Sequence, residues 1–442
     1  MQIKLSEHFD YKKLLQFTLP SIIMMVFTSI YGVVDGLFVS NIVGKTPFAA
    51  VNFIMPVLMI VGAIGFMFGM GGSALVGKTL GEQDTKKANE LFSLFVYVTA
   101  VCGVILGILT IVFLKDIALL LGAEGQMLEN CVLYGRVVLL ALPFYMLQYL
   151  FQSFFITAEK PNLGLAVTVI SGVTNMIFDA LFIAVFQWGL VGAALATAFS
   201  QLVGGIIPIF YFTLSKTSVL KLTKCRFDGK ALIKATINGS SELMNNISMS
   251  IVSMIYNVQL YTYAKENGIA AYGVLMYVNF IFLAVYIGYA TGIAPAVSYQ
   301  FGAKNSKELK SLKEKSFVVI GVLSAVMFAL AELLGSPLSN IFVGYDAELF
   351  EMTKRAFFIY SFSFLVVGFS IFGSCFFTAL NNGLISALIT FIRTLVLQVG
   401  SVLLFPLIWE LDGIWLSIVF AEGVSVIITL IFLIANKKKY HY

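Results

Sequence analysis

The sequence contains few charged residues for its length. Only 12% of its 442 residues are Asp, Glu, Lys or Arg, whereas a soluble domain carries about 25%. Hydrophobic residues make up 59% of the chain and include 41 Phe. This composition excludes a soluble enzyme, a disordered chain and a nucleic-acid-binding protein, and it predicts an integral membrane protein.

Histidine and cysteine are also scarce. The two histidines lie in the first ten and the last two residues, which argues against His-based catalysis inside the protein. The four cysteines are far apart and form no CxxC pair, so they predict neither a disulfide framework nor a zinc site. No DxxxD run supports a membrane prenyl transferase.

The most prominent feature of the sequence is its long apolar runs. Because a membrane-spanning helix needs about 20 apolar residues, the runs between charged or turn-rich breaks predict twelve spans. Their expected limits are 14–39, 48–77, 91–114, 131–156, 163–186, 189–214, 235–263, 270–300, 316–335, 355–379, 384–408 and 412–435. The first run leads straight into further spans without a small-residue cleavage site, so we expect no signal peptide.

The basic residues predict how the chain is oriented. Of the 28 Lys and Arg, 21 fall on one side of the expected spans, five on the other, and two inside spans. Because cytoplasmic loops carry the excess of Lys and Arg, both termini are expected in the cytoplasm. The basic stretch 216–234 then lies in a cytoplasmic linker at the midpoint of the chain, and no nucleic acid is expected as a partner.

The two halves of the sequence resemble each other at an offset of 221 residues. This offset aligns the loop LGEQDTKKANEL with FGAKNSKELKSL and the end of the fourth span with the end of the tenth. Six spans per half give both halves the same orientation, as in transporters built from parallel repeats. We therefore predict an all-α membrane protein with two pseudo-symmetric six-helix bundles, residues 1–214 and 235–442, joined by a linker at 215–234.

Acids inside predicted spans are the first candidates for function, because a buried carboxylate costs about 2.5–3.5 kcal/mol on insertion scales. Asp35 lies late in the first span, and Asp179 lies late in the fifth span with Asn175 one turn before it. Residues four apart share a helix face, so Asn175 and Asp179 can address one ligand. Close carboxylates in a low-dielectric medium share a proton or bind a small cation together. The alternative is that each is separately hydrogen-bonded to backbone or water.

Other polar residues in the spans are candidates for a substrate cavity. The seventh span opens with NGSSELMNNISMS, where a lipid-facing helix would leave polar groups unsatisfied. The predicted cavity residues are Tyr31, Tyr145, Gln148, Gln152, Glu242, Asn246, Met249 and Ser253. Helix packing through small polar residues explains the serines equally well. Arg393 in the eleventh span is expected to reach the interface or to pair with Glu422.

The chain resembles the multidrug and toxic compound extrusion (MATE) family, in particular a bacterial branch of it, over essentially its full length. The resemblance depends on the twelve spans in two halves and on YGVVDGLFVS, NMIFDALF and GLVGAALATAFSQ. It implies a cation site at Asp35, Asn175, Asp179 and Thr197, which could hold Na⁺. Some family members also use a glutamate of the seventh span, which Glu242 matches, and an aspartate of the tenth span, which this chain lacks.

The resemblance implies export of amphipathic, often cationic drugs in exchange for H⁺ or Na⁺, by alternating access and without another cofactor. A monomer in the plasma (inner) membrane is expected. A lipid-linked sugar flippase of the same superfamily is an alternative, but its diphosphate substrate would favour several basic residues in the cavity. A membrane enzyme is a more remote alternative.

Overall fold

The computed structural model describes residues 3–442, and its regular elements in that range are all helical. The α-helices are α1 Tyr11–Phe38, α2 Lys45–Gly81, α3 Thr85–Leu120, α4 Gly125–Leu140, α5 Leu142–Thr157, α6 Pro161–Asp179, α7 Gly189–Leu214, α8 Gly229–Gly302, α9 Ser306–Val343, α10 Ala347–Ser361, α11 Val367–Ala379, α12 Gly383–Phe391, α13 Val399–Leu404 and α14 Pro406–Tyr440. Three π-helical segments, η1 Val39–Val43, η2 Ala180–Val185 and η4 Ile392–Gln398, and the 3₁₀ segment η3 Phe362–Leu365 connect some of them.

Helix α8 is a hairpin that contains two of the predicted spans. Its backbone leaves helical geometry at Lys265, where φ is 51° and ψ is −140°. The rings of Tyr256 and Tyr272 stack with centroids 5.2 Å apart, although 16 residues of straight helix would separate them by about 24 Å. The chain therefore reverses near Lys265, and the seventh and eighth spans run antiparallel.

The membrane-spanning helices agree in number with the sequence prediction. Within residues 3–442, length and apolarity identify ten candidate spans, or eleven if α4 and α5 together form one. Counting the α8 hairpin as two spans brings the number to twelve. The fourth span differs from the straight helix expected at 131–156, because α4 and α5 meet at a 57° bend. Pro143 in the first turn of α5 explains the bend, since proline cannot continue the preceding helix.

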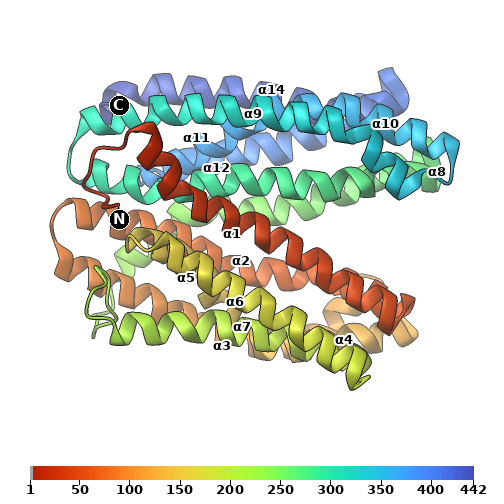
Figure 1. Ribbon diagram of the computed structural model, residues 1–442, viewed down its shortest axis with the longest axis horizontal. Helices are drawn as coiled ribbons and strands as arrows, with labels where there is room; N and C mark the ends of the chain where they lie inside the picture. Colours follow the sequence, from red (N-terminus) through yellow and green to blue (C-terminus); the bar gives the residue numbers. More distant parts are fainter. Residues whose placement is uncertain (1–2) are drawn as a thin grey trace.

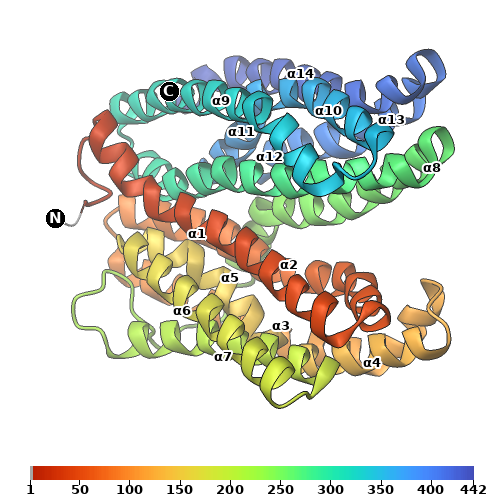
Figure 2. The same ribbon diagram turned by 45° about the vertical axis from the view of Figure 1, so that its right-hand side comes forward.

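The helices gather into two groups, as Figures 1 and 2 show. Helix α1 packs on α6, α2 packs on α3, α4 and α5, and α7 packs on α5 and α6. In the other group α8 packs on α9 to α12, and α14 packs on α10 and α11. Helices α1 and α2 also contact α8, which joins the groups. The boundary at 215–234 stays a prediction; the segment 215–228 between α7 and α8 is not helical.

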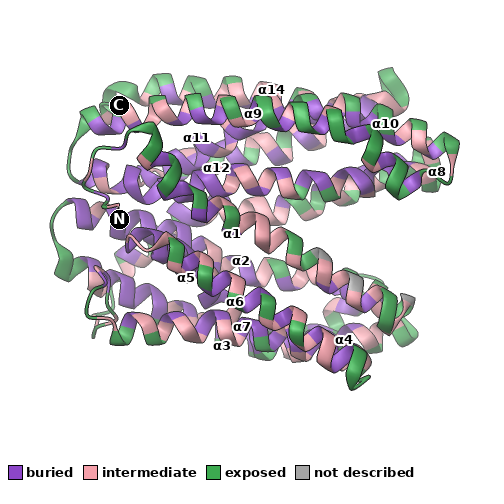
Figure 3. Ribbon diagram, in the orientation of Figure 1, coloured by how far each residue is buried: buried purple, intermediate pink, exposed green. Residues whose placement is uncertain are grey.

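Outward-facing surfaces of the helices are apolar, as a lipid environment requires. On α3, Val104, Ile108 and Val112 follow each other at four-residue spacing and are 49%, 59% and 63% exposed. Figure 3 shows exposed residues along the outer helices and buried residues concentrated where the two groups meet. Because a chain in water would bury such side chains, these surfaces indicate a protein surrounded by lipid.

The two groups make close backbone contact at the end of the molecule that carries both termini. There α2 ends at Gly81 and α8 ends at Gly302, two residues related by the 221-residue offset. A Cβ on Gly81 would lie 2.0 Å from the Tyr299 carbonyl oxygen, and one on Gly302 would lie 2.0 Å from that of Lys78. Glycine thus allows α2 and α8 to touch. In Figure 2 the two groups of ribbons separate towards the opposite end.

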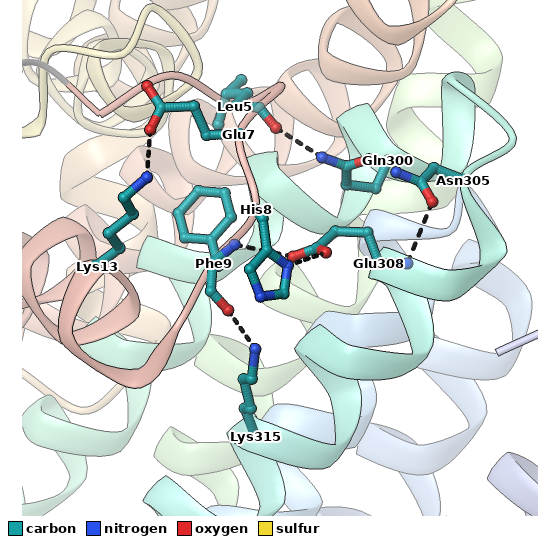
Figure 4. A network of polar contacts seen from close by, with 9 residues as sticks. All are labelled: Leu5, Glu7, His8, Phe9, Lys13, Gln300, Asn305, Glu308 and Lys315. Atoms are coloured by element: carbon teal, nitrogen blue, oxygen red, sulfur yellow. Dashed lines mark hydrogen bonds and ion pairs between the residues drawn. The ribbon is translucent and has the colours of Figure 1, made fainter.

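The segment before α1 ties the two groups together at the same end (Figure 4). The Leu5 amide donates a 2.8 Å hydrogen bond to Glu159 between α5 and α6, and Gln300 of α8 donates to the Leu5 carbonyl. Glu308 of α9 accepts from the Phe9 amide at 2.9 Å and contacts His8 at 2.6 Å. Residues 3–10, which we call the N-terminal segment, therefore contact both groups of helices.

Candidate cation and substrate site

Asp35, Asn175 and Asp179 come together inside the first group of helices. Asp35 is in the last turn of α1, and Asp179 is the last residue of α6. Asp35 interacts through its side chain with both Asp179 and Asn175. Asp179 is fully buried, and Asn175 and Asp35 are only 2% and 8% exposed. The structure thus brings together the two acids and the amide that sequence spacing selected.

Irregular helix geometry accompanies each of these acids. Asp35 lies one turn before the π-helical segment η1, and Asp179 directly precedes the π-helical segment η2. A π-helical turn shifts the phase of the following side chains and frees backbone groups, and it is frequent at functional sites. The third π-helical segment, η4, contains Arg393, a partly buried basic residue of the other group of helices.

Thr197 of α7 and Tyr134 of α4 complete the site. The Tyr134 side chain interacts with Thr197 and lies within electrostatic range of Asp35 and Asp179. Thr197 was implied by the family resemblance, whereas sequence reasoning missed Tyr134. No spacing rule connects α4 with α1, α6 and α7, so only the fold places this hydroxyl beside the acids.

The oxygen atoms of this site fit a small cation or a proton. Within residues 3–442, six buried oxygens of the five residues lack a hydrogen-bond partner: Asp35 Oδ1, both Asp179 carboxylate oxygens, Asn175 Oδ1, Thr197 Oγ1 and Tyr134 Oη. Hard cations prefer carboxylate, carbonyl and hydroxyl oxygens. The same part of the chain holds no group of three or more His, Cys, Asp or Glu side chains suited to a metal, so a cation here would also use neutral oxygens.

The pairing of two carboxylates gives this site its chemistry. Two ionised carboxylates in contact repel each other strongly where water is excluded, and within residues 3–442 neither of them forms a salt bridge with a basic side chain. A proton shared between them, or a cation bound by both, removes this repulsion. The site can therefore bind and release a positive charge, which a permanently paired acid cannot do.

Tyrosines extend the site along the interior of the first group. Tyr31 of α1 lies within electrostatic range of Asp35 and Tyr149, and Tyr145 within range of Tyr31 and Tyr134. The hydroxyls of Tyr145 and Tyr149 are 3.1 Å apart. Tyr31 and Tyr145, two predicted cavity residues, therefore belong to one aromatic cluster beside the acids, which also includes Tyr149.

Gln148 and Gln152 point elsewhere, although they share a helix face with Tyr145. The Gln148 amide donates to Ser171 of α6 at 3.3 Å, and the Gln152 amide donates to Thr168 of α6 at 3.5 Å. Both side chains are buried. The structure thus places them between α5 and α6, where they hold helices of one group together.

A second polar cluster lies in the other group of helices. Arg393 Nε donates to both carboxylate oxygens of Glu422 at 2.9 Å, and the Gln398 amide donates to the same carboxylate at 3.1 Å. This confirms the pairing of Arg393 with Glu422. Glu242 of α8 lies within electrostatic range of Arg393 and is partly exposed.

The remaining predicted cavity residues follow Glu242 along α8. The Asn246 side-chain amide donates to the backbone carbonyl of Glu242 at 2.9 Å, so its hydrogen bond is made within α8. Met249 is 38% exposed, and Ser253, partly exposed, interacts with Tyr272 across the hairpin. The eight predicted residues are therefore distributed over three places: the tyrosine cluster, the α5–α6 contact and α8.

Twelve membrane spans in two similar groups, with paired acids inside one of them, define a multi-pass membrane transporter. The fold closely matches solved structures described as MATE in complex with MaL6 (TM-score 0.93, 22% identity, 98% of each chain) and as an outward-facing multidrug resistance MATE family transporter (TM-score 0.92, 22% identity, 98% of this chain and 97% of that one). A MOP superfamily transporter from Pyrococcus furiosus, described as having a binding pocket of reversed polarity, matches with a TM-score of 0.91 at 22% identity over 98% of each chain.

The family model MatE matches residues 20–181 and 243–403, so the chain belongs to the MatE family. Among curated proteins it is similar to Multidrug export protein MepA of Staphylococcus saprophyticus, with 27% identity over 81% of this chain and 80% of that protein. The MepA protein of Staphylococcus aureus strain MSSA476 is also 27% identical, over 77% of this chain and 75% of that protein. These matches confirm three predictions: the family, the all-helical membrane fold, and that the protein is a transporter and not an enzyme.

Proposed function

We propose that the chain is a multidrug efflux transporter that exports amphipathic, cationic drugs in exchange for H⁺ or Na⁺. Its membership of a transporter family and its similarity to proteins named multidrug exporters support drugs as the substrate class. The observation that carries the coupling is the buried contact between Asp35 and Asp179. Each positive charge that enters the cell contributes about 2.3 kcal/mol per 100 mV of membrane potential.

Alternating access follows from the geometry if both termini are cytoplasmic, as the basic residues predict. The two groups then touch at the cytoplasmic ends of α2 and α8, so the molecule faces outward. Binding of a cation at Asp35, Asn175, Asp179, Thr197 and Tyr134 removes the repulsion between the acids. A change of this kind favours one access state over the other and so couples ion entry to drug exit.

We place the drug between the two groups, bounded by the tyrosine cluster on one side and by Glu242, Met249 and Ser253 of α8 on the other. Aromatic faces and a flexible methionine suit apolar ring systems of varied shape. Glu242 supplies a negative charge for a cationic group. We further propose that the two groups are bundles of residues 1–214 and 235–442 and that the protein acts as a monomer in the plasma membrane.

The flippase alternative needs basic side chains that face the interior. Arg136 on α4 is exposed, and Arg393 is held by Glu422. Neither arginine therefore offers a free positive charge to a diphosphate, so we favour drug export.

Replacement of Asp35 by Asn tests the coupling role. Asn keeps the size of the side chain but cannot release a proton or balance a cation, so gradient-driven dye efflux should fall to the background of cells without the transporter. The measurement is ethidium efflux from energised cells with equal amounts of membrane-inserted protein.

Asp116→Asn is the matched control, because this exposed acid of α3 lies away from the site. It should leave efflux unchanged. Normal efflux by the Asp35→Asn protein would show that the buried pair does not couple ion and drug.

A further inference from the structure

A small cavity outside the transport site lies at the terminus-bearing end of the second group of helices. It measures about 400 Å³ and lies between the first turns of α8 and the turn from α11 to α12. Lys230, Ile233, Lys234 and Ile237 line it from one face of α8, because they recur at helical spacing. We call it the α8–α12 cavity. Nothing in the transport mechanism uses it.

The α8–α12 cavity combines positive charge with an apolar rim. Lys230 and Lys234 lie in the first two turns of α8, and the predicted span begins directly after them. Ile233, Ile237 and Leu384 are 63%, 49% and 66% exposed at the rim. A water-soluble anion would need only the lysines, whereas a molecule with a charged head and apolar chains also covers the rim.

The polar amides of the cavity are already engaged in holding its walls. Asn238 donates to Asn381, and Asn381 donates to the Ala74 carbonyl of α2. The Asn382 amide donates to Tyr440. These hydrogen bonds leave the two lysines as the groups that can bind an anion.

Positive charge at this place is not balanced by the protein. Burial lowers the pKa of Lys234, and nearby Lys78 and Lys87 lower it further, while Glu82 acts in the opposite direction. Glu82 itself pairs with Lys78 at 3.4 Å. Among residues 3–442 no salt bridge is formed by Lys230 or Lys234, so an anion would relieve repulsion among several lysines.

In the first half of the chain, the lysine that corresponds to Lys234 is neutralised by an acid. Lys13 of α1 corresponds to Lys234 through the 221-residue offset, and its Nζ lies 2.6 Å from Glu7. The hydrogen bond to Glu7 raises the pKa of Lys13, the opposite of the shift at Lys234. Glu7 belongs to the N-terminal segment, which contacts Glu159 of the first group and also α8 and α9 (Figure 4).

At the position that corresponds to Glu7 the linker carries Asp228, whose carboxylate accepts from the Ala231 amide as the N-cap of α8 and forms no salt bridge within residues 3–442. The rest of the linker lies against another helix. It folds back on α3, where the Lys221 amide donates to Asn89 and the Thr223 amide donates to Ser93. Among the described residues no acid therefore pairs with Lys230 or Lys234, in contrast to the Lys13–Glu7 pair of the first half.

We propose that the α8–α12 cavity binds an anionic phospholipid, with its phosphate between Lys230 and Lys234 and its acyl chains along Ile233, Ile237 and Leu384. With both termini in the cytoplasm, the cavity lies at the anionic leaflet, where basic pockets between helices hold lipid head groups. The phosphate would also lie near Lys78 and Lys87 of the first group, so the lipid supports contact between the groups at this end. This site goes beyond drug export and does not depend on it.

Lipid titration of the purified full-length protein in neutral detergent tests this proposal. Native mass spectrometry counts bound lipid, with phosphatidylglycerol and phosphatidylcholine of identical acyl chains as the two probes. The wild type should retain phosphatidylglycerol preferentially. Lys230→Gln/Lys234→Gln should bind it about 30-fold more weakly, because each lysine near an anionic lipid contributes about 1 kcal/mol.

Lys221→Gln/Lys224→Gln is the matched control, since it removes the same charge from exposed linker positions outside the cavity. It should bind phosphatidylglycerol like the wild type. Should the double cavity variant fail to fold, Lys230→Gln alone, at an exposed position, should weaken binding about fivefold.

Two results would overturn the lipid site. One is equal phosphatidylglycerol binding by the wild type and the cavity variants. The other is a rise of Tm in inorganic phosphate as large as that in phosphatidylglycerol, which would identify a site for free phosphate. Neither result depends on drug transport, so the lipid site and the proposed function can fail separately.

Discussion

At the residue scale, the buried acids of the two halves are stabilised in different ways. Glu422, which is 1% exposed, has a permanent partner in Arg393 and a further donor in Gln398. Asp35 and Asp179 have each other, and like charges in contact need a mobile positive charge. The Glu422–Arg393 pair holds helices together, whereas the Asp35–Asp179 pair is stable only when a proton or cation is bound. We therefore propose a structural role for Glu422 and a coupling role for the aspartates.

Glu422→Gln should destabilise the protein by up to about 3 kcal/mol, because it leaves the partly buried Arg393 guanidinium without a counter-charge. The double variant Arg393→Gln/Glu422→Gln should lose less than the sum of the two single variants, since neither charge is then left alone. Thermal unfolding in detergent measures the three variants and the wild type. Additive losses would contradict a stabilising pair.

Sequence reasoning found the acids but not their surroundings. Asp35 and Asp179 are conspicuous because charged residues are rare in apolar spans, and the spacing to Asn175 is local. Tyr134 has no such signal, because tyrosine is ordinary in a membrane helix and its partners come from three other helices. The same limit applies to Gln148, where a shared helix face with Tyr145 did not reveal that the face turns towards α6.

At the element scale, the N-terminal segment acts as a connection between the two groups of helices. Leu5 and Phe9 are buried, and their backbone groups bond to Glu159, Gln300 and Glu308 on three different elements. Lys315 of α9 also donates to the Phe9 carbonyl. Any opening at this end must break these contacts, so the segment stabilises the closed arrangement.

Glu308→Ala should weaken this closure, because it removes the acceptor of the Phe9 amide and the partner of His8. Amide hydrogen exchange in 288–302, which packs on α1 and α2, should become about tenfold faster, as expected for a loss of about 1.4 kcal/mol. Glu314→Ala is the control, since Glu314 is exposed and pairs only loosely with Lys310 at 3.8 Å. Unchanged amide exchange in the Glu308→Ala protein would show that the N-terminal segment does not stabilise the closed arrangement.

The apolar runs predicted most membrane spans well but could not predict irregular helix geometry. The sixth span was expected at 189–214 and is α7, Gly189–Leu214, because a turn and a polar linker bound it. The π-helical segments η1, η2 and η4 depend on hydrogen bonds that shift by one residue, and they leave the apolar pattern intact. They nevertheless stand beside Asp35, Asp179 and Arg393, so the missed geometry lies where function is expected.

At the scale of the whole molecule, the repeat explains how one end can be closed while the other separates. Gly81 and Gly302 are related by the 221-residue offset, and each lies against the backbone of the other helix. Such a contact is formed or broken as a unit, because helix backbones at this distance leave no room for intermediate side-chain packing. We infer that the two groups rock as rigid bodies about the contact of α2 and α8.

The two halves are similar in fold but divide the chemistry between them. The offset places Tyr256 opposite Asp35 and Gly400 opposite Asp179, so the paired acids occur in the first half only. The second half has the fixed Arg393–Glu422 pair and the partly exposed Glu242. In our account the first half responds to the ion, the second half contributes the acidic side of the drug site, and rocking transmits the change between them.

The most direct test of this account is drug transport by the purified protein in liposomes with an imposed pH or Na⁺ gradient. A cation gradient of either kind should drive drug movement in the opposite direction, and the ion that does so is the coupling ion. Asp35→Asn protein in the same liposomes should show no gradient-driven movement. Drug movement that is absent under both gradients, or that persists in the Asp35→Asn protein, would contradict cation-coupled drug export.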